Sequence, residues 1–138
     1  MRVSLMNIKE IFSDKKGEYE MTKDYSVKEI FDKIEQALNE NPKPIEGINA
    51  IYQYDLSGDD GGTYQLHLSG GEAKVYDDSP NQADCTLQMS VNDFKEMLMG
   101  NLSGTAAFMS GKLKVKGNIG LAMKLENLLR QYDVNQYI

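Results

Sequence analysis

In the stretch INAIYQYDL, residues 48–56, every second side chain from Ile48 onward is apolar or aromatic, and most of those between are polar. The same period recurs in residues 63–68, 73–76 and 84–89. A period of two with one polar face is typical of antiparallel strands that are covered on one side only. The connections are short and rich in Gly, Asp and Ser, which favours turns. These features predict a four-strand meander.

A helix is predicted immediately before these strands. Ser26, with Glu29 three residues later, is the sequence signature of a capping box. The helix should end at Asn41-Pro42-Lys43-Pro44, because proline lacks the backbone amide hydrogen that a continuing helix needs. Between these signals the apolar residues recur at helical spacing and make one apolar face: Val27, Ile30, Phe31, Ile34, Ala37 and Leu38.

Helical spacing returns after the fourth strand. Ser90 is the predicted N-cap of a helix whose apolar stripe ends near Gly100. A short segment of small residues follows at 103–110. Residues 112–116, KLKVK, alternate strictly and predict a fifth strand. The last helix, 119–129, is apolar around much of its surface, so it should be deeply buried or border something apolar. The predicted fold class is α+β, a five-stranded and mostly antiparallel sheet with helices packed on one face.

The composition excludes several classes of protein. The 138 residues include 15 Lys and Arg against 21 Asp and Glu, and this net charge of −6 disfavours binding to nucleic-acid phosphates. The single cysteine, Cys85, and the single histidine, His67, argue against a disulfide framework and against Cys- or His-based metal sites. No apolar run approaches the roughly 18 residues of a membrane span, and no signal peptide is visible. We expect a cytoplasmic protein with no metal and no cofactor.

No group of side chains in the sequence is arranged for catalysis. His67 falls on the polar face of a predicted strand with no nucleophile motif beside it, and Cys85 should point into the core. Residues 55–61, DLSGDDG, resemble the start of a calcium loop. Asp60 and Leu66 stand where an EF-hand needs Gly and Glu, so a hairpin tip is expected instead. We therefore predict no catalytic residues.

Lys112, Lys114 and Lys116 form a basic strip in an acidic chain. One interpretation is that lysines on an edge strand discourage aggregation. The other is that they make transient contact with a membrane surface through anionic lipid head groups, or bind an acyl-carrier phosphate. The sequence leaves both interpretations open.

Five of the eight methionines lie in the second half of the chain: Met89, Met97, Met99, Met109 and Met123. Methionine is flexible and polarisable, so it suits a cavity that accepts varied apolar ligands, although it also fills gaps in ordinary cores. In this chain, Met97, Met109 and Met123 lie on three short segments that also carry other large apolar residues. These segments offer more apolar surface than a thin two-layer core needs, and we interpret the surplus as the lining of an internal tunnel.

Several motifs in this half resemble one family. Residues 83–90 (ADCTLQMS), 107–118 (AFMSGKLKVKGN) and 120–125 (GLAMKL) closely resemble the sterol carrier protein type-two family, also called non-specific lipid-transfer proteins. The resemblance extends over about residues 26–129. It implies a five-stranded sheet with helices over one face, a hydrophobic tunnel between them, and no catalytic residues in this domain. The ligands it implies are sterols, fatty acids, fatty acyl-CoAs and phospholipids.

The resemblance also implies which residues bind the ligand. We expect them to be Phe94, Met97, Leu98, Leu102, Phe108, Met109, Val115, Ile119, Leu121, Ala122, Met123, Leu125 and Leu128. The expected function is to bind, and to transfer or sequester, a fatty acid, an acyl-CoA or a sterol- or isoprenoid-like lipid, as a stand-alone monomer or weak dimer and without catalysis. The alternative is a non-catalytic accessory protein that presents a lipid intermediate to partner enzymes of lipid or quinone metabolism.

Residues 26–138 are predicted to form the lipid-binding domain, and residues 1–25 an N-terminal extension or leader. Residues 13–20 are polar and aperiodic. Lys16-Gly17-Glu18 can be encoded by codons that contain GGAG, a ribosome-binding sequence, shortly before the codon for Met21. We expect that Met21 is the natural start and that the first twenty residues are dispensable. The alternative is an N-terminal helix that packs on the domain.

Overall fold

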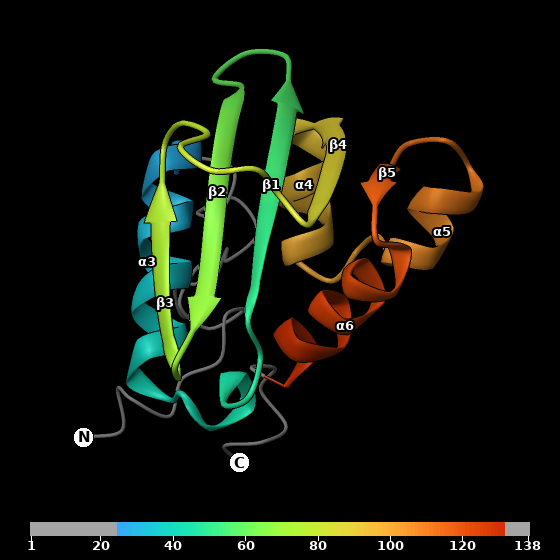
Figure 1. Cartoon of the computed structure of the whole chain (residues 1–138). Helices are drawn as coiled ribbons and strands as arrows, with labels where there is room; N and C mark the ends of the chain where they lie inside the picture. The colour runs from blue at the N-terminus through green and yellow to red at the C-terminus, as the bar shows by residue number, and fades with distance from the viewer. Residues whose placement is uncertain (1–24, 132–138) are drawn as a thin grey trace.

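A computed structural model describes residues 25–131, and the predictions made for residues 1–24 and 132–138 lie outside this part. The helices are α3 (Val27–Glu40), α4 (Val91–Leu98), α5 (Gly104–Met109) and α6 (Ile119–Arg130), with a short 3-10 helix, η2 (Lys43–Ile45), after α3. The strands are β1 (Ala50–Ser57), β2 (Gly62–Ser69), β3 (Glu72–Tyr76), β4 (Cys85–Ser90) and β5 (Lys114–Gly117). The predicted α+β class with a five-stranded sheet is confirmed (Figure 1).

The order of the strands differs from the predicted meander. β1, β2 and β3 are antiparallel neighbours, but β4 pairs with β1 in parallel and β5 pairs with β4, so the order is β3-β2-β1-β4-β5. The chain reaches β4 through residues 77–84, which cross in front of β2 and β1 (Figure 1). Alternation determines which face of a strand is buried, whereas it says nothing about which strand lies beside it. The meander prediction was therefore wrong at this connection.

The crossing segment covers a polar cluster on the outer face of the sheet. Gln65 is fully buried there, and its side-chain amide donates to the Asn81 carbonyl at 2.7 Å and to Gln53 Oε1 at 2.8 Å. The amide oxygen of Gln65 lies 2.8 Å from His67 Nε2. Burial lowers the pKa of His67. His67 thus belongs to a structural hydrogen-bond network on the face of the sheet opposite the core.

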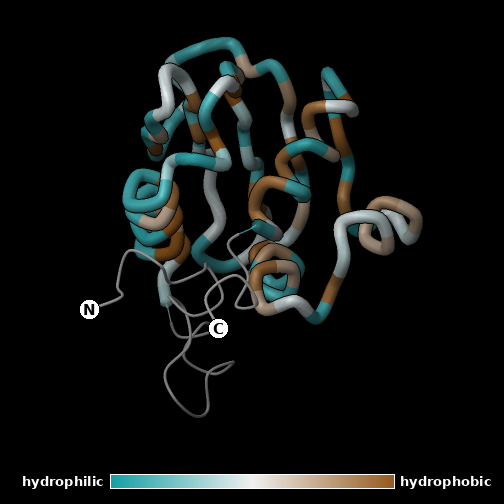
Figure 2. Tube along the Cα trace, turned by 90° about the horizontal axis from the view of Figure 1, so that it is seen from below, coloured by the Kyte–Doolittle hydropathy of each residue, from teal (hydrophilic) through white to brown (hydrophobic). Residues whose placement is uncertain are grey.

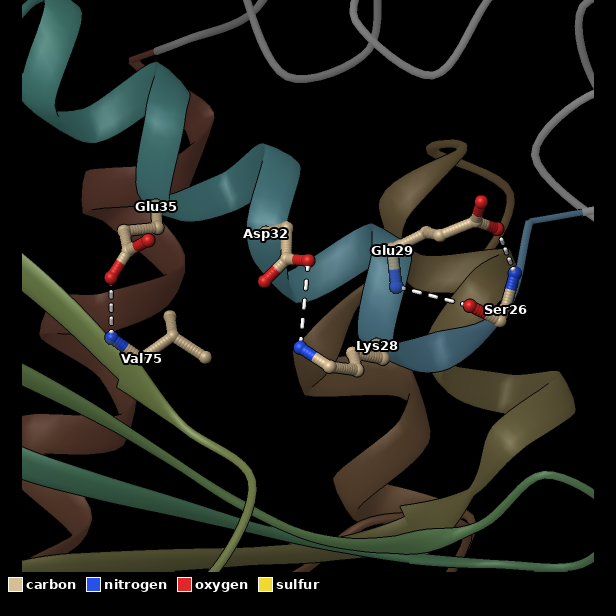
Figure 3. Close-up of polar contacts among 6 residues, drawn as sticks. All are labelled: Ser26, Lys28, Glu29, Asp32, Glu35 and Val75. Carbon is tan, nitrogen blue, oxygen red and sulfur yellow. Dashed lines mark hydrogen bonds and ion pairs between the residues drawn. The ribbon is translucent and has the colours of Figure 1, made fainter.

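Helix α3 begins at the predicted capping box. The Glu29 amide donates to Ser26 Oγ at 3.1 Å, and the Ser26 amide donates to Glu29 Oε1 at 2.9 Å (Figure 3). A further amide at this end, that of Val27, donates to the carboxylate of Asp60 at 2.7 Å. Asp60 lies at the tip of the β1–β2 hairpin, in the left-handed region with φ +64°. The residues that resemble a calcium loop therefore form a hairpin tip that also holds the start of α3.

The same helix protects one edge of the sheet. Glu35 accepts a hydrogen bond from the Val75 amide at 2.8 Å (Figure 3), and Asn39 both donates to the Ala73 carbonyl and accepts from the Ala73 amide. An uncovered edge strand offers unpaired backbone groups to other chains. These contacts occupy those groups on β3. They leave β5 as the edge that no described helix borders in this way.

Aromatic rings fill the centre of the core between the sheet and α3. Phe31 stacks between Tyr64, at 4.5 Å between ring centroids, and Phe94, at 5.2 Å, and meets Tyr54 edge-on at 5.3 Å. Aromatic pairs in these arrangements contribute about 0.5–1.5 kcal/mol each beyond the area that they bury. Figure 2 shows the hydrophobic side of α3 turned toward the sheet. The residues that the helical period placed on this face are all buried.

A further tyrosine in this core, Tyr52, has no hydrogen-bond partner for its hydroxyl within residues 25–131. Tyr52 is fully buried, and no described residue pairs with its Oη atom. Burial raises the pKa of Tyr52 to about 12, and the nearby Cys85 and Asp84 add to the effect. Burial likewise raises the pKa of Tyr54 and of Cys85. The folded protein therefore holds these groups in their neutral forms.

We predict that the free energy of unfolding falls steeply between pH 10 and 12. Unfolding returns Tyr52 to its ordinary pKa of 10.0, so above that pH the unfolded chain loses a proton that the folded chain keeps. Each such tyrosine lowers stability by up to about 1.4 kcal/mol per pH unit. Urea unfolding across this range should show a shallower fall for Tyr52→Phe.

At neutral pH, Tyr52→Phe should be at least as stable as the native chain, because it removes an unpaired buried hydroxyl. A large loss of stability would contradict this.

Candidate functional site

A cavity of about 630 Å³ lies between the β4–β5 end of the sheet and helices α4, α5 and α6. Most of its walls are apolar side chains. They come from β1, β4 and β5 on one side and from the three helices on the other. The lining residues are Tyr54, Leu87, Met89, Phe94, Met97, Leu98, Gly100, Leu102, Ser103, Gly104, Thr105, Phe108, Leu113, Val115, Ile119, Ala122, Met123, Leu125, Glu126 and Leu129.

Local sequence signals place these helices around the cavity. Gly100 follows α4 in the left-handed region with φ +83°, as the predicted helix stop requires. Ser103 caps α5 by accepting from the Ala106 amide at 3.0 Å, and Asn118 caps α6 by accepting from the Leu121 amide at 3.2 Å. These local signals set where α4 ends and where α5 and α6 begin. All three helices contribute side chains to the same apolar cavity.

The turn between β5 and α6 requires a glycine. Gly117 has φ +88°, and a Cβ atom added to it would lie 2.6 Å from the carbonyl oxygen of Asp84. Any other residue would be strained by its dihedral angle and would also collide with backbone. This close approach holds the start of α6 beside the start of β4.

A carboxylate joins α6 to the start of α5. Glu126 Oε2 accepts a hydrogen bond from the Gly104 amide at 2.8 Å. Gly104 is buried, and a Cβ atom there would lie 2.7 Å from Glu126 Oε1. A negative charge at a helix N-terminus is favourable, because the first amides of a helix lack partners within it. Glu126 therefore serves the structure of the cavity wall rather than acting as a free acid.

The chemistry available inside the cavity is limited. Its polar side chains are those of Tyr54, Ser103, Thr105 and Glu126, and its described lining includes no His, Cys, Lys or Arg. The Ser103 hydroxyl oxygen already caps α5, and the Glu126 carboxylate accepts from the amide of the next residue, Gly104, so both polar groups are engaged in the structure. This arrangement suits burial of an apolar molecule with few polar contacts.

All but three of the predicted ligand-binding residues line this cavity. The exceptions are Met109, whose side chain is 79% exposed, Leu121, which packs half-buried against the core, and Leu128, which is fully inside the core. The prediction included most of the apolar surface of α6 but omitted Leu129, which lines the cavity. The helical period divides that surface, because Ile119, Ala122 and Met123 face the cavity while Leu128 faces the sheet.

Several cavity residues were absent from the prediction. The strands contribute Tyr54, Leu87 and Met89, and Leu113 precedes β5. Their positions on the inward face of the alternation were the signal that could have identified them. No such signal identified Ser103, Thr105 and Glu126. A polar residue at the start of a helix is normally interpreted as a cap, and a polar residue within a helix is normally expected to be exposed.

The other singled-out residues do not line the cavity. Cys85 is buried in the core, and His67 is on the opposite face of the sheet. Lys114 and Lys116 are exposed on β5, which is an edge strand, and Lys112 is exposed just before it. No helix within residues 25–131 combines the length and apolar character that crossing a bilayer requires.

Comparison with known proteins gives one consistent result. The model of the SCP-2 sterol transfer family matches residues 31–130. "Hydroxysteroid dehydrogenase-like protein 2" of Bos taurus is 42% identical over 78% of this chain and 26% of its own length, and "Sterol carrier protein 2" of Rattus norvegicus is 40% identical over 77% of this chain and 19% of its own length. The chain thus spans about a quarter or less of these curated relatives.

A solved structure agrees with this match. The sterol carrier protein domain 2 of Helicoverpa armigera superposes with a TM-score of 0.67 and 32% identity, over 80% of this chain and 90% of the other. The resemblance inferred over about residues 26–129 is confirmed.

Proposed function

Because this chain belongs to the SCP-2 sterol transfer family, we propose that its cavity binds the long apolar part of one lipid molecule and releases it intact. Membership of this family supports lipid binding and transfer as the general function of this chain. The finer proposal is that the ligand is a single-chain or compact lipid, such as a fatty acid, a fatty acyl-CoA, or a sterol- or isoprenoid-like molecule.

The observation that carries this proposal is an open apolar cavity beside a well-packed core. A volume of about 630 Å³ lies within the range of roughly 300–1,000 Å³ that is usual for small-molecule sites. Burying one methylene contributes about 0.8 kcal/mol, while association costs about 4–15 kcal/mol. On the order of ten methylenes are needed to offset that cost. Long-chain lipids should therefore bind and short-chain acids should not.

The cavity reaches the surface between α5 and α6. Phe108, Ile119 and Met123 line it and are also 47%, 51% and 64% exposed. A ligand can enter past these side chains toward the inner wall, where Tyr54 and Phe94 belong both to the lining and to the aromatic core. This access supports exchange of lipid over permanent storage.

We further propose that the described domain acts without catalysis. Within the lining, Ser103 and Glu126 are both engaged at the start of α5. His67, which could serve as a base, lies on the opposite face of the sheet. The Ser103 hydroxyl and the Glu126 carboxylate thus serve helix α5, which supports a binding role without catalysis.

The test is the content and selectivity of the purified full-length protein. Native mass spectrometry should show one lipid bound per chain. A fluorescent fatty acid should be displaced by palmitate, and by octanoate at least about 100-fold less well, because octanoate buries several fewer methylenes. Absence of any bound lipid, together with no displacement by palmitate, would overturn the proposal.

A further inference from the structure

The large exposed apolar residues of the described chain gather in one region. They are Phe108 and Met109 on α5 and Ile119 and Met123 on α6, with exposures of 47% to 79%. α5 and the start of α6 lie together at the β5 side of the molecule, and α5 is coloured mostly in the neutral to hydrophobic range (Figures 1 and 2). Single exposed apolar residues are ordinary, whereas a contiguous group around a cavity mouth indicates a binding surface.

The charges in this region differ from those of the rest of the chain. Residues 97–125 contain four lysines and no aspartate or glutamate, although the whole chain has a net charge of −6. Lys112, Lys114, Lys116 and Lys124 are all exposed. None of them forms an ion pair within the part of the chain that the structure describes. The segment that carries the apolar group therefore carries positive charge alone, and Glu126, which follows it, is hydrogen-bonded to the Gly104 amide.

We propose that these eight residues form a docking surface for an anionic lipid bilayer. We define the docking surface as Phe108, Met109, Lys112, Lys114, Lys116, Ile119, Met123 and Lys124. The apolar side chains enter the interfacial layer, and the lysines contact the anionic head groups. The inference rests on the proposed function, because it gives the lipid in the cavity a membrane as its source and destination.

The combination of apolar and cationic side chains favours a bilayer over other partners. Membrane-surface segments join buried apolar area to electrostatic attraction, and reversible binding needs both. A second copy of this chain is disfavoured, because a symmetric interface uses the same surface on both partners, so both sides would carry four lysines and no carboxylate. An anionic bilayer neutralises these charges and accepts the apolar side chains at the same time.

The position of the cavity mouth strengthens this assignment. Phe108, Ile119 and Met123 belong both to the docking surface and to the cavity lining. Docking would therefore place the mouth in the interface. A lipid could then move between bilayer and cavity without exposing its apolar chain to water, which is the costly part of transfer.

Two variants of the full-length chain test the proposal without altering the cavity. Met109→Glu puts a charge on the docking surface at a residue that does not line the cavity. The triple variant Lys112→Gln, Lys114→Gln, Lys116→Gln removes three charges. Its matched control is Lys28→Gln, Lys43→Gln, Lys74→Gln, which removes three exposed charges elsewhere.

The measurement is flotation with vesicles of phosphatidylcholine, with and without phosphatidylglycerol. The native chain should bind only the anionic vesicles, and added salt should weaken binding. The docking-surface triple variant should bind about 100-fold less well and Met109→Glu at least about 10-fold less well, while the control triple variant binds like the native chain. Equal loss in both triple variants, or self-association that Met109→Glu abolishes, would overturn the proposal.

Fatty-acid binding in solution separates this proposal from the proposed function. Both docking-surface variants should bind a fluorescent fatty acid with the affinity of the native chain. If the native chain binds the fatty acid but not anionic vesicles, the docking surface is wrong and the lipid-binding function stands. If it binds neither, the proposed function and the docking inference are both overturned.

Discussion

Replacing Leu98 with glutamate is expected to abolish binding of a long-chain fatty acid, with a loss of affinity of at least about 100-fold. Leu98 ends α4, is half-buried, and lines the cavity. A carboxylate there must either lose its hydration or draw water into the cavity, and both cost several kcal/mol against an apolar ligand. Displacement of a fluorescent fatty acid measures the effect directly.

Two further variants make the Leu98 result interpretable. Met109→Glu introduces the same carboxylate on the neighbouring helix but outside the cavity, and it should change the affinity less than about twofold. Ala122→Trp fills the cavity with an apolar group, so it should also abolish binding while keeping the thermal transition of a folded domain. Unchanged affinity in both Leu98→Glu and Ala122→Trp would show that the ligand lies elsewhere.

Truncating Phe31 to alanine should lower the free energy of unfolding by about 3–5 kcal/mol. Phe31 is almost fully buried and is the only ring that contacts Tyr54, Tyr64 and Phe94 among the described aromatic pairs. Its loss leaves a cavity where α3, α4 and the sheet meet, and the neighbouring rings cannot close that space without leaving their own positions. Urea denaturation gives the value.

Phe108→Ala is the matched control, since it makes the same chemical change at a ring that is 47% exposed. Its effect on stability should stay within about 1 kcal/mol. A comparable loss in the two variants would mean that α5 belongs to the cooperative core. That result would contradict the division between a packed aromatic centre and an open cavity wall.

The sequence predicted the individual elements well because their signals are local. Ser26 and Glu29 form the capping box that their spacing predicted, and the alternation from residue 48 correctly identified the inward residues of β1. The neighbour of β4 could not be read in this way. Its parallel pairing with β1 depends on a crossing segment that is held by Gln65 and Asn81, two residues whose polarity suggested exposure.

The cavity was predicted in outline through its apolar surplus and through the family resemblance. The prediction placed Met97, Met109 and Met123 alike in the lining of the cavity. Met109, however, is the last residue of α5, and its side chain points into solvent. Composition shows that apolar surface is in excess, whereas only the orientation of each helix determines which part of it encloses a space. Glu126 illustrates the reverse case, because a charged residue forms part of an apolar cavity wall by hydrogen bonding to a helix start.

The methionines allow the central claim to be measured residue by residue. Carbon-13 labelling of the methionine methyl groups, followed by titration of the protein with palmitate, reports where the ligand lies. Met89, Met97 and Met123 line the cavity, whereas Met99 and Met109 do not. If the cavity holds the lipid, the methyl signals of the first three shift on saturation with one equivalent, and those of the other two remain nearly unchanged. Shifts confined to Met99 and Met109, or no shifts at any of the five, would contradict the assignment of the cavity as the lipid site.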